Sequence, residues 1–207
     1  SIRYTTSHPL DMDLDLIKAH KNVDKLMPYL HLPIQSGSDF ILSKMKRKHT
    51  ALEYKNMIRK VRSVRPDISI TSDFIIGYPG ETENHFQETL DLISDIEFDD
   101  GYSFIYSKRP GTIASSEIDN VSLDEKKERL SKVQDLLRKN SEKYLSRLVN
   151  TKQRILVEGK SKKIKGELYG RTFTNKIVHF VASDEFLGKT IEVEILKANR
   201  SSLYGCI

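Results

Sequence analysis

The sequence predicts an α/β fold over residues 1–150, followed by a small all-β barrel over residues 151–207. In the first part, strand-like segments alternate with amphipathic helical segments, which is typical of parallel strands joined by helical crossovers. After Asn150 the helical periodicity stops, and short alternating segments separated by Lys- and Gly-containing turns replace it. The excess of positive charge also lies in this last part: residues 1–150 carry 23 Lys and Arg against 23 Asp and Glu, whereas residues 151–207 carry 11 against 6.

The first part contains four segments that are rich in β-forming residues. They cover residues 1–6, 30–35, 68–76 and 102–106. Four parallel strands do not close a (β/α) barrel, and the first of them starts at Ser1. We therefore expect a partial barrel whose sheet edge lacks upstream partners. A chain that starts with Ser rather than Met also indicates a piece of a longer protein.

Four helices are expected between and after these strands. A weak one covers residues 11–19. Thr50 and Glu53 form a capping box that opens the second, and Thr82 is positioned to cap the third. Ser122 and Glu125 form another capping box before a long helix, which has apolar residues at core spacing at Leu130, Val133, Leu137, Tyr144 and Leu148.

The tail contains five short segments with the alternation of strands. They cover residues 153–158, 167–171, 177–181, 191–196 and 203–207, and they predict a small β-barrel. A core of this size is marginal by itself, so we expect the barrel to pack against the long helix. Its basic character favours a polyanionic partner such as nucleic acid, and the alternative is a surface that is basic without binding function.

Composition excludes several classes of protein. Hydrophobic content of 38% and charged content of 30% are typical of a soluble globular protein. No apolar run approaches the length of a membrane span, and no signal-peptide pattern opens the chain. The single cysteine, Cys206, excludes an internal disulfide and favours the cytoplasm. In the last strand of the barrel it is expected to be a small buried residue.

Polar and glycine-rich residues follow each predicted strand. In parallel α/β folds the carboxyl ends of the strands meet at one edge, where ligands bind. We therefore interpret these residues as one binding site, although each has a local alternative: a turn at Gly77, a helix cap at Gln35 and Ser36, an ion pair at Asp73, and a solvated charge at Arg109. The histidines lack the spacing of metal ligands, so structural roles are expected for His8, His31 and His49.

Four motifs at these strand ends resemble signature segments of the radical S-adenosylmethionine (SAM) methylthiotransferases. They are HLPIQSGSD at 31–39, MKRKHT at 45–50, DFIIGYPGET at 73–82 and YSFIYSKRPGT at 102–112, and their order and spacing match along the chain. Residues 5–9 and 153–159 most resemble the members that add a methylthio group to N6-isopentenyladenosine beside the tRNA anticodon.

This resemblance implies a division of labour. Residues 1–150 would be the C-terminal part of a radical SAM (β/α) barrel with a linking helix, and residues 151–207 a TRAM domain, a small RNA-binding β-barrel. SAM would be bound by residues at the barrel mouth, namely Gln35, Ser36, Asp73, Ile75 and Gly77. The 73–77 segment fits the family's glycine–isoleucine–glycine pattern only in part, because Asp73 stands at the first glycine position.

The resemblance also implies tRNA as the partner. Arg109 would meet the RNA near the target base. The remaining RNA contacts would come from the tail, through Arg154, Lys160, Lys162, Lys163, Lys165 and Arg171. The alternative for this lysine cluster is a solvated Lys-rich turn.

The number of cysteines departs from the family pattern. Family members bind one [4Fe–4S] cluster through a CxxxCxxC motif and a second through three cysteines of an upstream domain, because such clusters need thiolate ligands. This chain has one cysteine. We therefore expect no catalytic or metal-binding residue in it, and we expect the chain to be catalytically silent. SAM and both clusters would be bound in the complete parent enzyme, which we expect to be monomeric and cytoplasmic.

Two other interpretations stay open at the level of sequence. Sister methylthiotransferases act on threonylcarbamoyladenosine in tRNA or on a ribosomal protein. A different class is a stand-alone RNA-binding module, in which the partial barrel is only a scaffold. Cysteine triplets upstream of Ser1 in the parent reading frame would favour the enzyme, and a natural start at Ser1 would favour the binding module.

Overall fold

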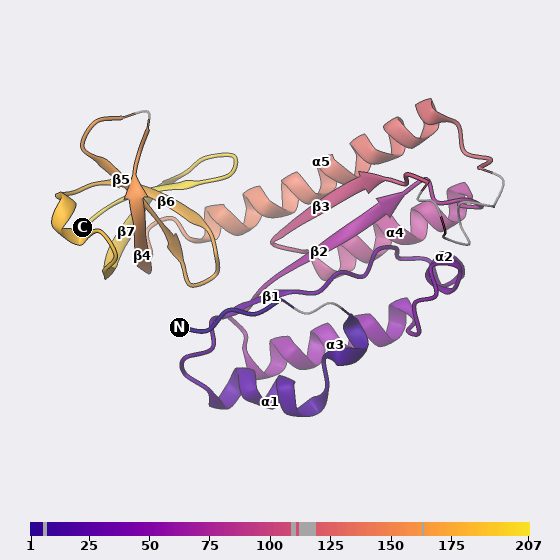
Figure 1. Ribbon diagram of the computed structural model, residues 1–207, viewed down its shortest axis with the longest axis horizontal. Helices are drawn as coiled ribbons and strands as arrows, with labels where there is room; N and C mark the ends of the chain where they lie inside the picture. The colour runs from indigo at the N-terminus through magenta and orange to yellow at the C-terminus, as the bar shows by residue number, and fades with distance from the viewer. Residues whose placement is uncertain (6–7, 109–110, 112–118, 163) are drawn as a thin grey trace.

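The computed structural model describes residues 1–5, 8–108, 111, 119–162 and 164–207. A three-stranded sheet with helices forms one end of the molecule and a closed five-stranded barrel the other, with a long helix, α5 (Leu123–Arg147), running between them (Figure 1). The predicted fold class is confirmed: an α/β part with a parallel sheet is followed by a small all-β barrel.

The sheet contains β1 (Tyr29–His31), β2 (Ser69–Ile76) and β3 (Asp100–Ile105), in that order and all parallel. The crossover from β1 to β2 contains α2 (Asp39–Lys44) and α3 (Ala51–Val64), and the crossover from β2 to β3 is α4 (Glu83–Ile96). The three carboxyl ends therefore lie at the same edge, as the alternation of strands and helices predicts.

The prediction of a strand over residues 1–6 is wrong. Within the described residues, this segment makes one isolated parallel bridge, between Ile2 and Leu26. Extending the pairing would need the N–H of Tyr29 to reach the Tyr4 carbonyl, but that N–H donates to the Met27 carbonyl at 2.8 Å. The Tyr4 side chain instead lies 2.6 Å from His20 through its hydroxyl oxygen and Nε2.

The strand expected over residues 30–35 is shorter than predicted. Regular pairing ends at His31, because the N–H of Ile34, which would continue the ladder to the Asp73 carbonyl, donates to the Ser72 hydroxyl at 3.0 Å instead. The chain meets β2 again at Gln35, which forms a bridge to Phe74. Between these two pairs the segment has one more residue than β2, so the regular ladder is interrupted just before the polar residues at the strand end.

The helix starts follow the capping signals in the sequence. Thr50 and Glu53 form the predicted capping box of α3, and Thr82 caps α4. Ser122 caps α5 by accepting the N–H of Glu125, but the reciprocal half of the predicted box is replaced, because the Glu125 carboxylate accepts a hydrogen bond from Arg129.

The N-terminal helix begins later than its predicted start. A 3-10 turn, η1 (Pro9–Asp11), precedes α1 (Leu14–Asn22). The side chain of Asp13 accepts the N–H of Leu16, so that the helix starts after this cap.

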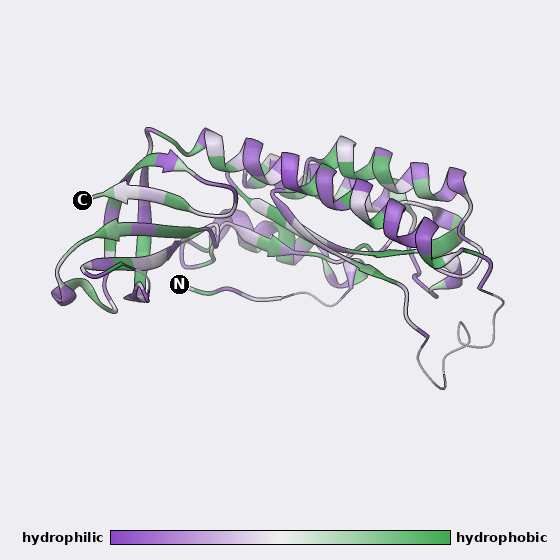
Figure 2. Ribbon diagram, turned by 90° about the horizontal axis from the view of Figure 1, so that it is seen from above, coloured by the Kyte–Doolittle hydropathy of each residue, from purple (hydrophilic) through white to green (hydrophobic). Residues whose placement is uncertain are grey.

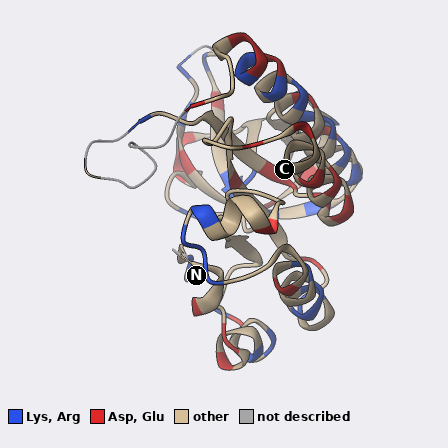
Figure 3. Cartoon of the chain, turned by 90° about the vertical axis from the view of Figure 1, so that its right-hand side faces the viewer, with Lys and Arg blue, Asp and Glu red and all other residues tan. Residues whose placement is uncertain are grey.

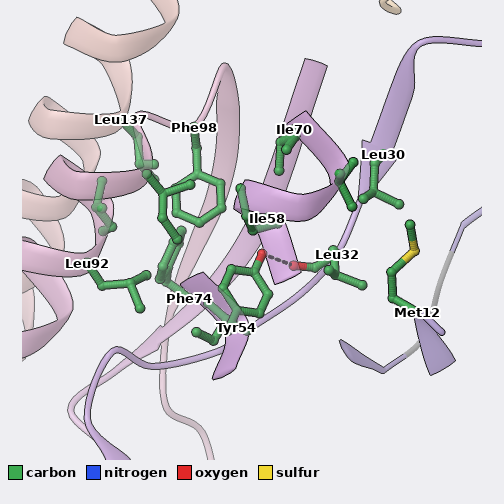
Figure 4. Packing of buried hydrophobic residues seen from close by; sticks show 14 of the residues in the cluster. Met12, Leu30, Leu32, Tyr54, Ile58, Ile70, Phe74, Leu92, Phe98 and Leu137 are labelled. Atoms are coloured by element: carbon green, nitrogen blue, oxygen red, sulfur yellow. Dashed lines mark hydrogen bonds between the residues drawn. The ribbon is translucent and has the colours of Figure 1, made fainter. Parts of the chain in front are cut away.

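The core of the α/β part lies between the sheet and the helices. Figure 4 shows Phe74 and Ile70 of β2 facing Tyr54 and Ile58 of α3, with Phe98 beside them. The Tyr54 hydroxyl donates to the Leu32 carbonyl at 2.7 Å, so its polar atom is satisfied inside the core (Figure 4). Burial raises the pKa of Tyr54 well above its ordinary value.

The barrel is closed in the order β4-β5-β6-β8-β7. Its strands are β4 (Lys152–Lys160), β5 (Glu167–Thr172), β6 (Ile177–Val181), β7 (Thr190–Ala198) and β8 (Leu203–Cys206), with a 3-10 turn, η3 (Asp184–Phe186), before β7. Leu145 of α5 belongs to the buried cluster of this barrel, so the barrel does pack against the long helix. Hydrophobic and hydrophilic residues alternate along α5 (Figure 2), which lets one helix serve both cores.

The barrel lies beside the amino ends of the sheet strands, away from their carboxyl edge (Figure 1). Lys176, which is 7% exposed, attaches it there by donating from Nζ to the Asp99 carbonyl at 2.9 Å. The same ammonium group lies 5.2 Å from the ring centroid of Tyr144 on α5. A buried cation with a carbonyl and an aromatic ring as partners fixes the barrel against the sheet.

The expectation that Cys206 is buried is wrong, since its side chain is exposed. Side chains alternate between the two faces of a strand. Leu203 of β8 points into the barrel and is fully buried, which places Tyr204 and Cys206 on the outer surface.

Candidate functional site

One face of the parallel sheet is open. On β2, Ile70, Phe74 and Ile76 are buried in the core that the helices cover. The alternate residues face the other way, and the register pairs Asp73 with Tyr102 and Ile75 with Phe104. Tyr102 is 58% and Phe104 55% exposed. Parallel sheets are normally covered on both faces, so an open face with exposed aromatic rings indicates a surface for a ligand or partner.

A pocket of about 790 Å³ lies on this face at the carboxyl ends of the strands. This volume is in the range of sites for cofactors of nucleoside size. Its walls combine polar and apolar side chains, among them Gln35, Arg47, Asp73, Ile75, Phe104 and Tyr106.

Gln35 occupies an unusual backbone conformation at the edge of the pocket. Its φ of 81° lies in the left-handed region, which non-glycine residues rarely adopt. Two backbone bonds to β2 hold it there: its N–H donates to the Asp73 carbonyl at 3.0 Å, and its carbonyl accepts the N–H of Ile75 at 2.9 Å. A strained backbone that its neighbours fix in this way is a common feature of ligand sites.

Asp73 and Arg47 provide opposite charges to the pocket. Asp73 Oδ2 lies 3.5 Å from His31 Nε2, and His31 Nδ1 lies 2.9 Å from the Thr71 hydroxyl. Burial lowers the pKa of Arg47, and the nearby Asp73 carboxylate partly offsets that effect. A carboxylate and a guanidinium group in one pocket suit a ligand that carries both an ammonium and a carboxylate group.

Two other residues of the predicted cofactor site lie behind the pocket rather than on it. Ser36 is 1% exposed, and its hydroxyl lies 3.4 Å from that of Thr89 on α4 while accepting the N–H of Ser38. Gly77, at φ 71°, donates its N–H to Glu81 Oε1 at 3.0 Å. A Cβ at Gly77 would lie 2.3 Å from Cγ of Lys126, so glycine allows α5 to approach this turn.

Several pocket residues were not singled out in the sequence. Lys44 donates to the Pro79 carbonyl at 2.9 Å, and the rings of Tyr78 and Tyr106 meet at 5.0 Å. Arg47 lies inside the MKRKHT motif, but the sequence alone does not indicate its role. The alternation of β3 is the signal that could have identified Phe104, because the position paired with Ile75 must share its face.

A buried ion pair lies under the 77–81 turn. Arg129 of α5 donates to Glu81 Oε1 at 2.9 Å, and the two side chains are only 4% and 1% exposed. Arg129 also pairs with Glu83 and Glu125. Burial raises the pKa of Glu81, while its bonds from Gly77 and Arg129 act in the opposite direction. This cluster fastens the start of α5 to the turn beside the pocket.

The predicted RNA contacts of the barrel fall into two groups. Arg154 lies near the start of β4 with its guanidinium 4.6 Å from the ring centroid of Phe173, in a cleft of about 740 Å³ between barrel and sheet. The second group lies about 20 Å further along β4, at the β4–β5 turn, and contains Lys160, Lys162 and Lys165. Lys160 pairs there with Asp184. Arg171 pairs with Glu158 at 3.2 Å. Arg109 and Lys163 lie outside the described residues.

His49 is a buried neutral side chain beside the site. It is 6% exposed, and within the described part of the chain neither ring nitrogen has a hydrogen-bond partner. Burial and the neighbouring His8 ring, 5.2 Å away, lower the pKa of His49 to about 4. This supports the expected structural role, because an uncharged imidazole suits an apolar position.

Acidification is expected to destabilise the chain through His49. The unfolded state binds the proton near the ordinary pKa of 6.5 and the folded state only near 4, so stability falls as the pH drops from 6.5 toward 4. Between about pH 7 and 5 the loss is about 2 kcal/mol. Urea denaturation of the wild type and of His49→Phe at both pH values isolates this contribution. Equal pH dependence of the two proteins would contradict it.

Comparison with known families identifies both parts of the chain. Residues 1–93 match the radical SAM superfamily, and residues 146–207 match the TRAM domain. The chain thus joins a segment similar to the radical SAM superfamily to one similar to the TRAM domain. The sequence resemblance stated above is thereby confirmed in both parts.

Curated relatives align with the whole chain. It is 51% identical over 206 residues to the tRNA-2-methylthio-N(6)-dimethylallyladenosine synthase of Yersinia pseudotuberculosis serotype O:1b (strain IP 31758), covering 100% of the chain and 44% of the relative. For the synthase of the same name from Shewanella pealeana, the identity is 52% over 204 residues, covering 99% of the chain and 43% of the relative. The chain thus spans less than half the length of these relatives.

The radical SAM match implies SAM and an iron–sulfur cluster for the family. The pocket suits SAM, because it offers both charges and apolar walls in a volume of nucleoside size. The residues present do not suit a cluster: in the described ranges no three His, Cys, Asp or Glu side chains converge, and Cys206 lies on the barrel. Among the helices of those ranges, none has both the length and the apolar character that crossing a bilayer requires.

Proposed function

We propose that this chain is the C-terminal part of a tRNA methylthiotransferase that modifies C2 of N6-isopentenyladenosine, the dimethylallyl nucleoside, by radical SAM chemistry. The observation that supports this most strongly is the alignment of the whole chain, at 51% identity, with a synthase named for that product. The pocket at the strand ends lies where such a fold binds its ligand.

The chain's own residues would hold SAM in this pocket. The Asp73 carboxylate would accept hydrogen bonds from the cofactor's amino or ribose groups, and Arg47 would pair with its carboxylate. Ile75 and Phe104, side by side on the open face, would pack against the adenine ring. Gln35 would contribute an amide at the rim, while Ser36 and Gly77 shape the loops behind it. When bound, SAM supplies the methyl group and the radical.

Iron–sulfur chemistry would be completed elsewhere in the parent protein. Three thiolates are needed for each of two clusters, and this chain contributes one cysteine. The chain's share of the reaction is therefore to bind SAM and to place the substrate base. The division into residues 1–150 and 151–207 would correspond to these two tasks.

The barrel would bind the tRNA substrate. It carries the whole excess of positive charge, and the open face of the sheet extends from the barrel toward the pocket. Arg171 of the barrel is close enough for its charge to act on Tyr102 of that face. A tRNA held on the barrel could thus reach the pocket along this surface. Such an enzyme would be monomeric and would work in the cytoplasm with the tRNA pool.

The parent enzyme carrying Asp73→Asn tests this proposal. We expect weaker SAM binding and at least about tenfold less methylthiolated nucleoside, because a charge-assisted hydrogen bond contributes about 1.5–3 kcal/mol. Product is measured by mass spectrometry of tRNA nucleosides from cells that lack their own synthase. Asp91→Asn, on the exposed side of α4, changes the same charge away from the pocket and should retain activity.

The identity of the product distinguishes the competing functions. A methylthio group on threonylcarbamoyladenosine or on a ribosomal protein would favour a sister enzyme. Binding of tRNA without any product by the complete parent protein would favour the stand-alone RNA-binding module, for which the basic barrel is the supporting observation.

A further inference from the structure

Three aromatic rings form a row across the outer surface of the barrel. Tyr169 of β5 is the register partner of His179 of β6, and His179 is the register partner of Tyr204 of β8. The centroids of Tyr169 and His179 lie 6.4 Å apart, and those of His179 and Tyr204 lie 5.4 Å apart with 25° between the ring planes. We call these three residues the aromatic row.

Neighbouring residues hold the row in place. Gly159 of β4 faces Tyr169, and a Cβ at Gly159 would lie 3.0 Å from the tyrosine ring, so the missing side chain makes room for it. A carboxylate orients the central ring: His179 Nδ1 lies 3.2 Å from Oε1 of Glu167, whose side chain is 6% exposed. The rings therefore form a surface whose geometry exists before any ligand binds.

The row remains accessible in the folded chain. All three rings are partly exposed. The barrel attaches to the sheet through the β5–β6 turn, where Asn175 bonds to Arg3 and Lys176 to Asp99, several residues away from the row. The exposed Cys206 lies two residues beyond Tyr204 on the same face of β8.

A cation lies at one end of the row. Lys197 of β7 is the register partner of Tyr204, so the two side chains share the outer face of the barrel. Two acidic groups near the other rings are engaged: Glu158 pairs with Arg171, and Glu167 contacts His179. Glu194 of β7 is exposed on the same face, opposite Cys206. A line of rings with a basic group at one end suits a single strand of RNA, whose bases stack and whose phosphates are anionic.

We propose that the aromatic row is a stacking platform for two or three unpaired bases of the RNA, with Lys197 next to a flanking phosphate. The proposal rests on the proposed RNA-binding function of the barrel and adds how the RNA is recognised. A duplex cannot use this platform, because its bases are already stacked on each other. The alternative role of the row is cross-strand packing that stabilises the barrel without contacting RNA.

Binding of an unstructured, fluorescein-labelled RNA of about twelve nucleotides to the 207-residue chain tests the platform. Fluorescence anisotropy is expected to show about tenfold weaker binding for Tyr204→Ala and for Tyr169→Ala, with an unchanged salt dependence. Tyr204→Phe keeps the ring and should bind nearly as the wild type does. Val181→Ala is the matched control, since this side chain is 76% exposed on β6 outside the row.

An abasic RNA with the same number of phosphates separates stacking from stability. The wild type should bind it about tenfold more weakly than the base-containing RNA, and Tyr204→Ala should cause no further loss. An equal loss on both RNAs would overturn the platform and assign the row to barrel packing, as would wild-type affinity in Tyr204→Ala. If the wild type binds none of these RNAs, the proposed RNA-binding function fails together with the platform.

Discussion

Replacing Arg129 with methionine is expected to lower the free energy of unfolding by about 3–5 kcal/mol. The substitution leaves the Glu81 carboxylate, which is 1% exposed, without its cationic partner inside the protein. Glu83 and Glu125 lose the same partner. Urea denaturation followed by circular dichroism at neutral pH measures the change.

Arg138→Met provides the matched control on the same helix. Arg138 pairs with Asp135 and Glu142, but these groups are accessible to solvent, so the loss should be below about 1 kcal/mol. A Glu81→Leu, Arg129→Leu double variant should recover much of the stability, since removing both buried charges avoids the uncompensated one. Equal losses in Arg129→Met and Arg138→Met would contradict the role of the buried pair.

Binding of tRNA by this chain is expected to weaken by about 100-fold when salt rises from about 50 to about 200 mM, as four phosphate contacts would require. The basic excess of residues 151–207 and the exposed lysines of the β4–β5 turn are the physical reason. A filter-binding titration at several salt concentrations gives the slope directly.

A triple variant with Lys160, Lys162 and Lys165 changed to Gln should lower that slope by about 2–3. The control carries the same loss of charge on α5, at Lys127, Lys132 and Lys139, and should keep the wild-type slope. Figure 3 shows acidic and basic residues interspersed along this helix. Identical slopes for the two triple variants would exclude the turn as the RNA contact.

The elements that the sequence predicted well are those governed by near neighbours along the chain. Thr50 and Glu53 start α3 because a capping box needs only the residues of one helical turn. The alternation of residues 153–158 defines the inner and outer faces of β4 in the same way. The strand-end motifs likewise placed Gln35 and Asp73 at the carboxyl edge, because parallel strands share that edge.

The failures occur where the outcome depends on contacts with distant residues. Residues 1–6 have the composition of a strand, but the N–H of Tyr29 that would extend the pairing donates to the Met27 carbonyl instead. Ser36 and Asp73 are both polar residues at strand ends. The Ser36 hydroxyl lies buried beside Thr89 of α4, whereas Asp73 lines the pocket on the open face.

The sequence by itself determined the order of the elements, the two-part organisation and the family resemblance, because periodicity, caps and motifs are local properties. Only the tertiary structure decided that Arg129 is a buried partner of Glu81, that Cys206 is exposed, and that Tyr169, His179 and Tyr204 form one row. Burial of a charge and the meeting of side chains across strands depend on register and packing between segments far apart in the chain, which no local pattern specifies.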